Sequence, residues 1–178
     1  RSGRFWRLVG VALLAGAGFE AAGALSGPWL VDRGLADDHI ATFRLASAAL
    51  MAGGALVGGR TADRMGAARA ARLWLAALAI LLLVTAVAGS VLLYAVVHLA
   101  IGGFTAASYA LFMRNARGPL AATVFSAFMG LTNACEAWAG RAGGALQERA
   151  GYGTALAVLA VVSLAAWPLL RERRPRGR

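Results

Sequence analysis

The sequence has a single cysteine, Cys135, so it cannot form an internal disulfide or a multi-cysteine metal site. It has no lysine, and only 15% of its residues are charged, against about 25% in an ordinary soluble domain. It has four prolines, and its 23 glycines are spread through apolar segments, which excludes collagen-like and disordered low-complexity chains. Hydrophobic residues make up 60% of the chain, a composition typical of an integral membrane protein.

Long apolar runs predict an all-α membrane protein with one domain, residues 1–178. A helix needs about 20 mostly apolar residues to cross a hydrocarbon core of roughly 30 Å. The stretch 73–113 has no charged residue and is about twice that length, so we place a reverse turn at Gly89-Ser90 and count two helices there. The predicted spans are about 8–30, 40–59, 73–89, 91–113, 119–146 and 154–170.

The positions of the 18 arginines predict the topology. Fourteen of them precede the first span, follow the last, or lie in the connections after the second and fourth spans. Only Arg33 and Arg149 lie in connections on the other side. Because cytoplasmic connections carry the excess of basic residues, we expect both termini in the cytoplasm, with the chain in a bacterial inner (plasma) membrane. The same sorting explains the net charge of +10 without a nucleic-acid partner, which would require one continuous basic face.

The first apolar run also resembles a signal peptide, because arginines precede it and small residues follow. Its length and the ionisable Glu20 inside it favour a membrane span instead. The chain does not begin with methionine, so we expect it to be part of a longer protein.

Four ionisable side chains lie inside the predicted spans: Glu20, Arg44, Glu136 and Arg141. An ionisable residue at mid-bilayer costs about 2.5–3.5 kcal/mol on insertion scales, so we expect a functional reason for each. They occur on the first, second and fifth spans, whereas the third and sixth have none. We therefore expect the third and sixth spans to face lipid. The other three surround a polar interior, which the fourth span joins through Tyr109.

Glycines four residues apart, which let helix backbones approach closely, occur on the same three spans. The pairs are Gly23 and Gly27, Gly54 and Gly58, and Gly140 and Gly144. Glu20 shares a helix face with the first pair, and Glu136 shares one with Thr132, Asn133 and Gly140. Both carboxylates are thus predicted to face a close neighbouring helix or a cavity.

Depth separates the candidate roles. Glu20 and Glu136 lie about ten residues from the outer ends of their spans, near the midplane. A carboxylate at that depth can be neutralised by protonation, which makes each of them a candidate proton carrier. The candidates for lining a substrate cavity are Arg44, Asn133, Tyr109 and Arg141. For the two arginines the alternative is that they extend to the outer surface and stabilise packing.

The connection after the second span contains Gly59, Asp63-Arg64 and Gly66. This spacing resembles the signature loop of the major facilitator superfamily, in which a glycine, three residues, Asp-Arg, any residue and a glycine follow the second helix. The basic pair that usually comes next is replaced by two alanines. An ordinary cytoplasmic loop explains the arginines but not Asp63 or the glycines. The resemblance implies a gating loop in which Asp63 bonds to a nearby arginine and to a helix N-terminus.

Two more segments carry the resemblance. Residues 27–34 resemble the turn after the first helix in the muropeptide permease, siderophore and acetyl-CoA transporter-like group, and residues 126–140 are similar to that group's eleventh helix. The resemblance implies one six-helix half, which we expect to be the C-terminal half, of a secondary transporter that moves a small solute by alternating access. We expect proton coupling, no cofactor, no metal, and a second six-helix half, either upstream or supplied by dimerisation.

Two other classes stay open, a membrane-embedded enzyme and a non-transporting scaffold. His98 has no accompanying nucleophile motif of the kind that intramembrane proteolysis requires. Metal-dependent lipid chemistry needs clustered aspartates, whereas Asp63 stands alone and Asp37-Asp38 is a surface pair. We therefore expect no enzymatic activity. A scaffold differs from a transporter in that substitution of Glu20 or Glu136 would not abolish solute uptake.

Overall fold

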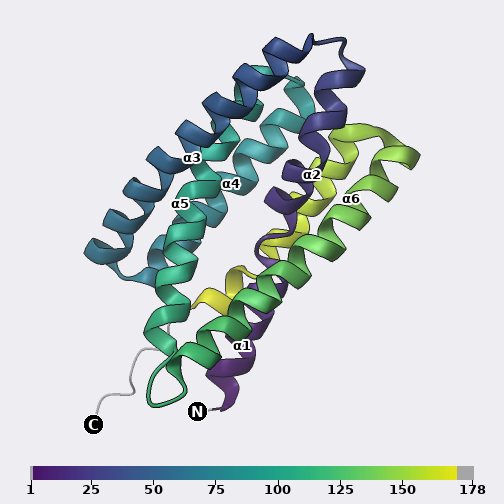
Figure 1. Ribbon diagram of the computed structural model, residues 1–178. Coiled ribbons are helices and arrows are strands. Elements are labelled where there is room, and N and C mark those ends of the chain that lie inside the picture. Colours follow the sequence, from purple (N-terminus) through teal and green to yellow (C-terminus); the bar gives the residue numbers. More distant parts are fainter. Residues whose placement is uncertain (1, 172–178) are drawn as a thin grey trace.

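The computed structural model describes residues 2–171, and every regular element within that range is helical (Figure 1). The elements are α1 (Ser2–Leu14), α2 (Ala17–Asp32), α3 (Asp37–Met65), α4 (Ala67–Ala88), α5 (Val91–Asn115), α6 (Ala121–Leu164) and the short 3₁₀ helix η1 (Trp167–Leu170). Five stretches are long and apolar enough to cross a membrane: Gly3–Asp32, Asp37–Met65, Ala67–Ala88, Val91–Asn115 and Ala121–Leu170. The all-helical class is confirmed, and the apolar helices are consistent with an integral membrane protein.

The first apolar stretch is broken where α1 gives way to α2. Such a break leaves carbonyls before it and N–H groups after it without their usual helical partners. Two side chains of α6 replace those partners: the Trp138 indole N–H donates to the Leu13 carbonyl at 2.9 Å, and the Ser163 hydroxyl accepts from the Gly18 N–H at 2.7 Å. Because a bilayer core offers no water to do this, α6 is what makes the break tolerable.

The reverse turn expected at Gly89-Ser90 is confirmed. Gly89 adopts the left-handed conformation, with φ of 59°, and ends α4. The Ser90 hydroxyl accepts a hydrogen bond from the Leu93 N–H at 3.4 Å and caps the start of α5. A glycine followed by a serine is therefore both a helix stop and a helix start in this chain.

α6 is interrupted at Gly151, whose φ of 82° and ψ of 167° are not helical. L side chains rarely adopt this backbone conformation, so glycine is required. Figure 1 shows the chain reversing direction here, from the green part of α6 to its yellow part. The two parts touch, because a Cβ added at Gly143 would lie 3.5 Å from the Leu159 side chain.

The connections separate to two ends of the helix bundle (Figure 1). The start of α1, the α3–α4 turn, the α5–α6 connection and η1 lie at one end, where the Arg7 guanidinium donates to the Arg171 carbonyl at 3.1 Å. The α2–α3 and α4–α5 connections and Gly151 lie at the other. We call the first the arginine-rich end, because it holds the arginine-bearing connections, and the second the opposite end. Which end faces the cytoplasm stays a prediction.

α3 packs on α5 through facing glycines. A Cβ added at Gly54 or Gly58 would run into the α5 backbone at Leu99 or Gly103, and one added at Gly102 would run into the α3 backbone. The predicted close packing of Gly54 and Gly58 is confirmed. We call these four glycines, Gly54, Gly58, Gly102 and Gly103, the packed glycine interface.

α4, the third predicted span, packs against other helices on one side and is exposed on the other. It contacts α2, α3, α5, α6 and η1, and it buries Leu75, Leu78 and Leu82 completely. Beyond Arg69 in its first turn, its exposed side is apolar, with Leu73, Ile80, Val84 and Val87. An exposed apolar side suits contact with lipid, and the expectation that this span faces lipid stays a prediction.

Candidate functional site

A cavity of about 80 Å³ lies between the α1–α2 break, α5 and α6. Among its lining residues are Glu20, Tyr109 and Thr132, together with Ser108 and the buried Cys135. Two of the sequence-predicted candidates, Glu20 and Tyr109, thus share one cavity although they are far apart in the sequence. Thr132, which was placed on the same helix face as Glu136, joins them.

The break in the first stretch determines where Glu20 sits. α2 begins at Ala17, so Glu20 lies in its first turn. N–H groups at a helix start are free of intrahelical partners and carry a partial positive charge, which favours a carboxylate nearby. Glu20 is half-buried in this position. Sequence reasoning missed this support because it treated the stretch as one continuous helix.

Glu136 and Asn133 are exposed on the first part of α6. Glu136 lies one helix turn beyond Thr132, which lines the cavity together with Glu20 and Tyr109. Tyr109 is 37% exposed, and its ring meets Phe125 edge-on. The two proton-coupling candidates and Tyr109 therefore form one polar group, which is partly in the cavity and partly on the surface of the bundle.

Arg44 and Arg141 are both exposed, and neither forms an ion pair with a carboxylate of residues 2–171. Arg44 reaches across to α2, where a Cβ added at Gly27 would lie 3.3 Å from its guanidinium. Arg141 lies roughly 140° around the helix from Glu136, at 100° per residue. The expected polar interior is therefore not enclosed within residues 2–171. Arg44 lies beside α2, and Arg141 lies on a different side of α6 from Glu136.

The glycines that flank the carboxylates are not packed like those of α3. Gly23 and Gly144 have nothing within 4 Å of an added Cβ, and Gly140 meets only Ala24 at an ordinary 3.6 Å. The predicted close packing of these two pairs is thus not found within residues 2–171. We call the residues along this side the open polar face: the half-buried Glu20 and the exposed Gly23, Ala24, Arg44, Asn133 and Glu136.

The predicted gating loop is a single-residue turn. Gly59, Asp63 and Arg64 lie in the last turns of α3, and Gly66, with φ of 90°, separates α3 from α4. One Asp63 oxygen lies 3.8 Å from the Arg114 guanidinium of α5. Within residues 2–171 Asp63 makes this ion pair and no hydrogen bond to a helix N-terminus. The ion-pair partner of Asp63 comes from α5 and not from the loop. α4 begins at Ala67, directly after Gly66, so the next arginines in the sequence are part of α4.

The opposite end holds polar contacts that the sequence analysis did not identify. The Tyr152 hydroxyl donates to Asp32 at 2.6 Å, and the Arg33 guanidinium stacks over Trp29 at 4.0 Å. Deeper in the bundle, the buried Tyr94 hydroxyl donates to the Ala22 carbonyl at 2.6 Å. The Tyr152–Asp32 and Tyr94–Ala22 hydrogen bonds join segments distant in sequence, so no local pattern marks them.

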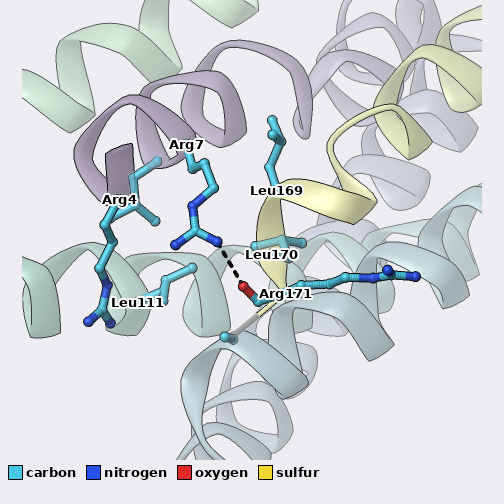
Figure 2. A pocket seen from close by; sticks show the side chains of 8 residues that line it. Arg4, Arg7, Leu111, Leu169, Leu170 and Arg171 are labelled. Carbon is cyan, nitrogen blue, oxygen red and sulfur yellow. Dashed lines mark hydrogen bonds between the residues drawn. The ribbon is translucent and has the colours of Figure 1, made fainter. Parts of the chain in front are cut away.

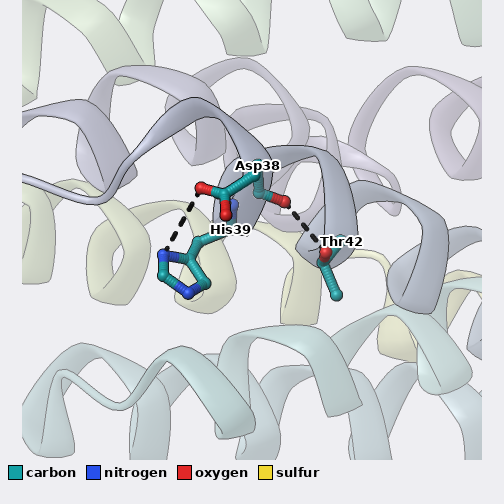
Figure 3. Close-up of polar contacts among 3 residues, drawn as sticks. All are labelled: Asp38, His39 and Thr42. Atoms are coloured by element: carbon teal, nitrogen blue, oxygen red, sulfur yellow. Dashed lines mark hydrogen bonds and ion pairs between the residues drawn. The ribbon is translucent and has the colours of Figure 1, made fainter.

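At the start of α3, the polar contacts of Asp38 are with its neighbours in the same helix. Asp38 accepts a hydrogen bond from the His39 backbone N–H at 2.9 Å, and its carboxylate lies 3.7 Å from the His39 ring (Figure 3). The Thr42 hydroxyl donates to the Asp38 carbonyl. In the part of the chain that the structure describes, no three histidine, cysteine or acidic residues group as metal ligands would.

Comparison with known proteins does not add to this geometry: no family model, no curated protein and no solved structure matches the chain.

Proposed function

We propose that this chain is a six-helix half of a secondary active transporter of the major facilitator type, which moves a small solute by alternating access. The observation that carries the proposal is the open polar face, where Glu20 lines a cavity beside the exposed Glu136 and Arg44. An ionisable residue that faces lipid at mid-bilayer costs about 2.5–3.5 kcal/mol. Contact with a water-filled path relieves this cost, and a transporter has such a path along its midplane site.

The six-span arrangement is part of the proposal. α6 supplies two spans, because the chain reverses at Gly151. The arginine-rich end then faces the cytoplasm by the excess of basic residues, with a bacterial inner membrane as the location. Asp63 and Arg114 link α3 to α5 at that end, which suits a latch that holds one access state closed.

A second helix bundle completes the site. Gly23 on the open polar face and Gly144 on α6 leave room for a close neighbour, and residues 2–171 supply none. A second bundle, in the same polypeptide or from another copy, covers this face and places the substrate between the two bundles. Glu20 and Glu136 carry the proton in this arrangement, since a carboxyl group can be charged when it faces water and neutral when the site closes.

The coupling role is tested by Glu20→Gln and Glu136→Gln in the complete transporter. We expect the coupling variant to lose accumulation of solute against a gradient and to keep counterflow exchange, because exchange does not require the empty site to release its proton. Glu148→Gln is the control, since it removes an exposed carboxylate outside the open polar face. If both Gln variants still concentrate solute, the coupling assignment is wrong. If they alter neither process, a non-transporting scaffold is the better account.

A further inference from the structure

Two cavities flank the start of α1 at the arginine-rich end, and they share Arg4 and Leu8. The first, of about 310 Å³, lies between α1, α4, α5 and η1 and is also lined by Arg7 and Arg171 (Figure 2). The second, of about 560 Å³, lies between α1 and the α5–α6 connection and is also lined by Arg117. Together they form a hollow that wraps around the first turns of α1.

The charge around this hollow has one sign. Four arginines line it, and no carboxylate of residues 2–171 does. Arg7 uses one N–H for the Arg171 carbonyl, and Figure 2 shows the Arg171 side chain extending away from Arg4 and Arg7. A guanidinium has five N–H donors, so Arg7 keeps most of its donors for another partner. Arg4 donates no hydrogen bond to any residue of the described chain.

Apart from Asn115 in the second cavity, the other side chains that line the hollow are apolar. Leu111 and Leu169 line the first cavity, and Phe5 and Phe128 line the second. Trp6, between the two arginines in sequence, is 67% exposed. Tryptophan and arginine at a helix end are typical of the headgroup level of a membrane. The hollow therefore combines guanidinium groups with apolar surface at the depth where phospholipids change from polar to apolar.

We propose that this hollow binds an anionic phospholipid, with its phosphate held by Arg4, Arg7 and Arg117 and its acyl chains along the leucine and phenylalanine walls. Guanidinium groups bind phosphate oxygens through paired, charge-assisted hydrogen bonds. A soluble phosphate ester presents the same group but leaves the apolar walls uncovered, so the lipid is the source that we assign. Basic pockets between membrane helices are suited to this chemistry. The site lies apart from the open polar face and does not depend on the transport function.

The test uses the full chain in detergent, with native mass spectrometry to count retained phosphatidylglycerol against a phosphatidylcholine background. Arg4→Gln/Arg117→Gln is compared with Arg33→Gln/Arg149→Gln, which removes the same charge at the opposite end. Arg7 is left intact because it also holds η1. At about fivefold per arginine, we expect the first double variant to lose affinity on the order of twentyfold and the control to bind normally.

Two further arms keep the result interpretable. Arg4→Lys/Arg117→Lys keeps the charge and is expected to retain most of the lipid, which separates loss of charge from loss of folding. Inorganic phosphate and glycerol 3-phosphate are titrated without lipid. Equal phosphatidylglycerol retention by the Gln variant and the wild type overturns the site. Tight binding of the soluble phosphates with no retained lipid overturns the lipid assignment.

Discussion

The same glycine spacing has two outcomes in this molecule. Gly54 and Gly58 of α3 press against the backbone of α5, whereas Gly23 of α2 and Gly144 of α6 have open space in front of them. Spacing of four residues makes a helix able to accept a close neighbour, but it does not say where the neighbour comes from. The packed glycine interface has no ionisable residue among its members, and the open polar face carries Glu20 and Glu136. The open space in front of Gly23 and Gly144 is what the proposed second bundle would fill.

The largest expected effect is the loss of stability when a bulky side chain replaces a glycine of the packed glycine interface. Gly54→Leu drives a side chain into the α5 backbone at Leu99, which cannot move aside as a flexible side chain would. We expect a loss of at least about 3 kcal/mol of stability, or failure to fold. Gly144→Leu, with nothing in front of it, should stay within about 0.5 kcal/mol. Thermal unfolding in detergent measures both, and similar destabilisation by the two variants would remove the distinction.

A smaller effect, on the rate of transport, is expected for the ion pair that links α3 and α5 at the arginine-rich end. Asp63 and Arg114 are both well exposed, so their contact is worth at most about 1 kcal/mol. We expect Asp63→Asn to slow turnover by about fivefold, the rate equivalent of that energy, with little change in substrate affinity or unfolding temperature. Arg114→Gln should reproduce this effect and Asp37→Asn should not. A loss of affinity equal to the loss of turnover contradicts a latch.

The smallest expected effect concerns a hydrogen bond beside the packed glycine interface. The Trp74 ring lies against Gly103, and its indole N–H donates to the Thr61 hydroxyl at 2.9 Å, which joins α3, α4 and α5. Trp74→Phe keeps an aromatic ring and removes the donor, so we expect a loss of about 1 kcal/mol of stability. Trp6→Phe, at a 67% exposed position, is the control and should change nothing measurable. An unchanged unfolding temperature for Trp74→Phe would mean that this hydrogen bond does not hold the three helices.

Local patterns in the sequence were enough for the long apolar helices and for the Gly89-Ser90 turn, because each depends on residues close together in the chain. The spacing of Gly54 and Gly58 predicted close packing but not its partner, because Leu99 and Gly103 belong to a distant helix. The break before Ala17 was missed, because the groups that satisfy it, Trp138 and Ser163, come from the far end of the sequence. The sequence analysis also expected the polar site to be surrounded by helices of this chain, and it is open on one side. Glycines and carboxylates on one helix face predict a neighbour, but they do not distinguish one in the same bundle from one in another.

The central claim is that the open polar face meets water and a partner bundle, and not lipid. Ala24 on this face and Ile80 on the apolar side of α4 are both exposed, and each lies eight residues from the opposite end of its helix, about 12 Å along the axis. Each is replaced by cysteine in a Cys135→Ser background, in native membranes with both sides accessible, and treated with a charged maleimide. The account predicts that Ala24→Cys is labelled and Ile80→Cys is not. Equal labelling of the two positions, or protection of both, would contradict it.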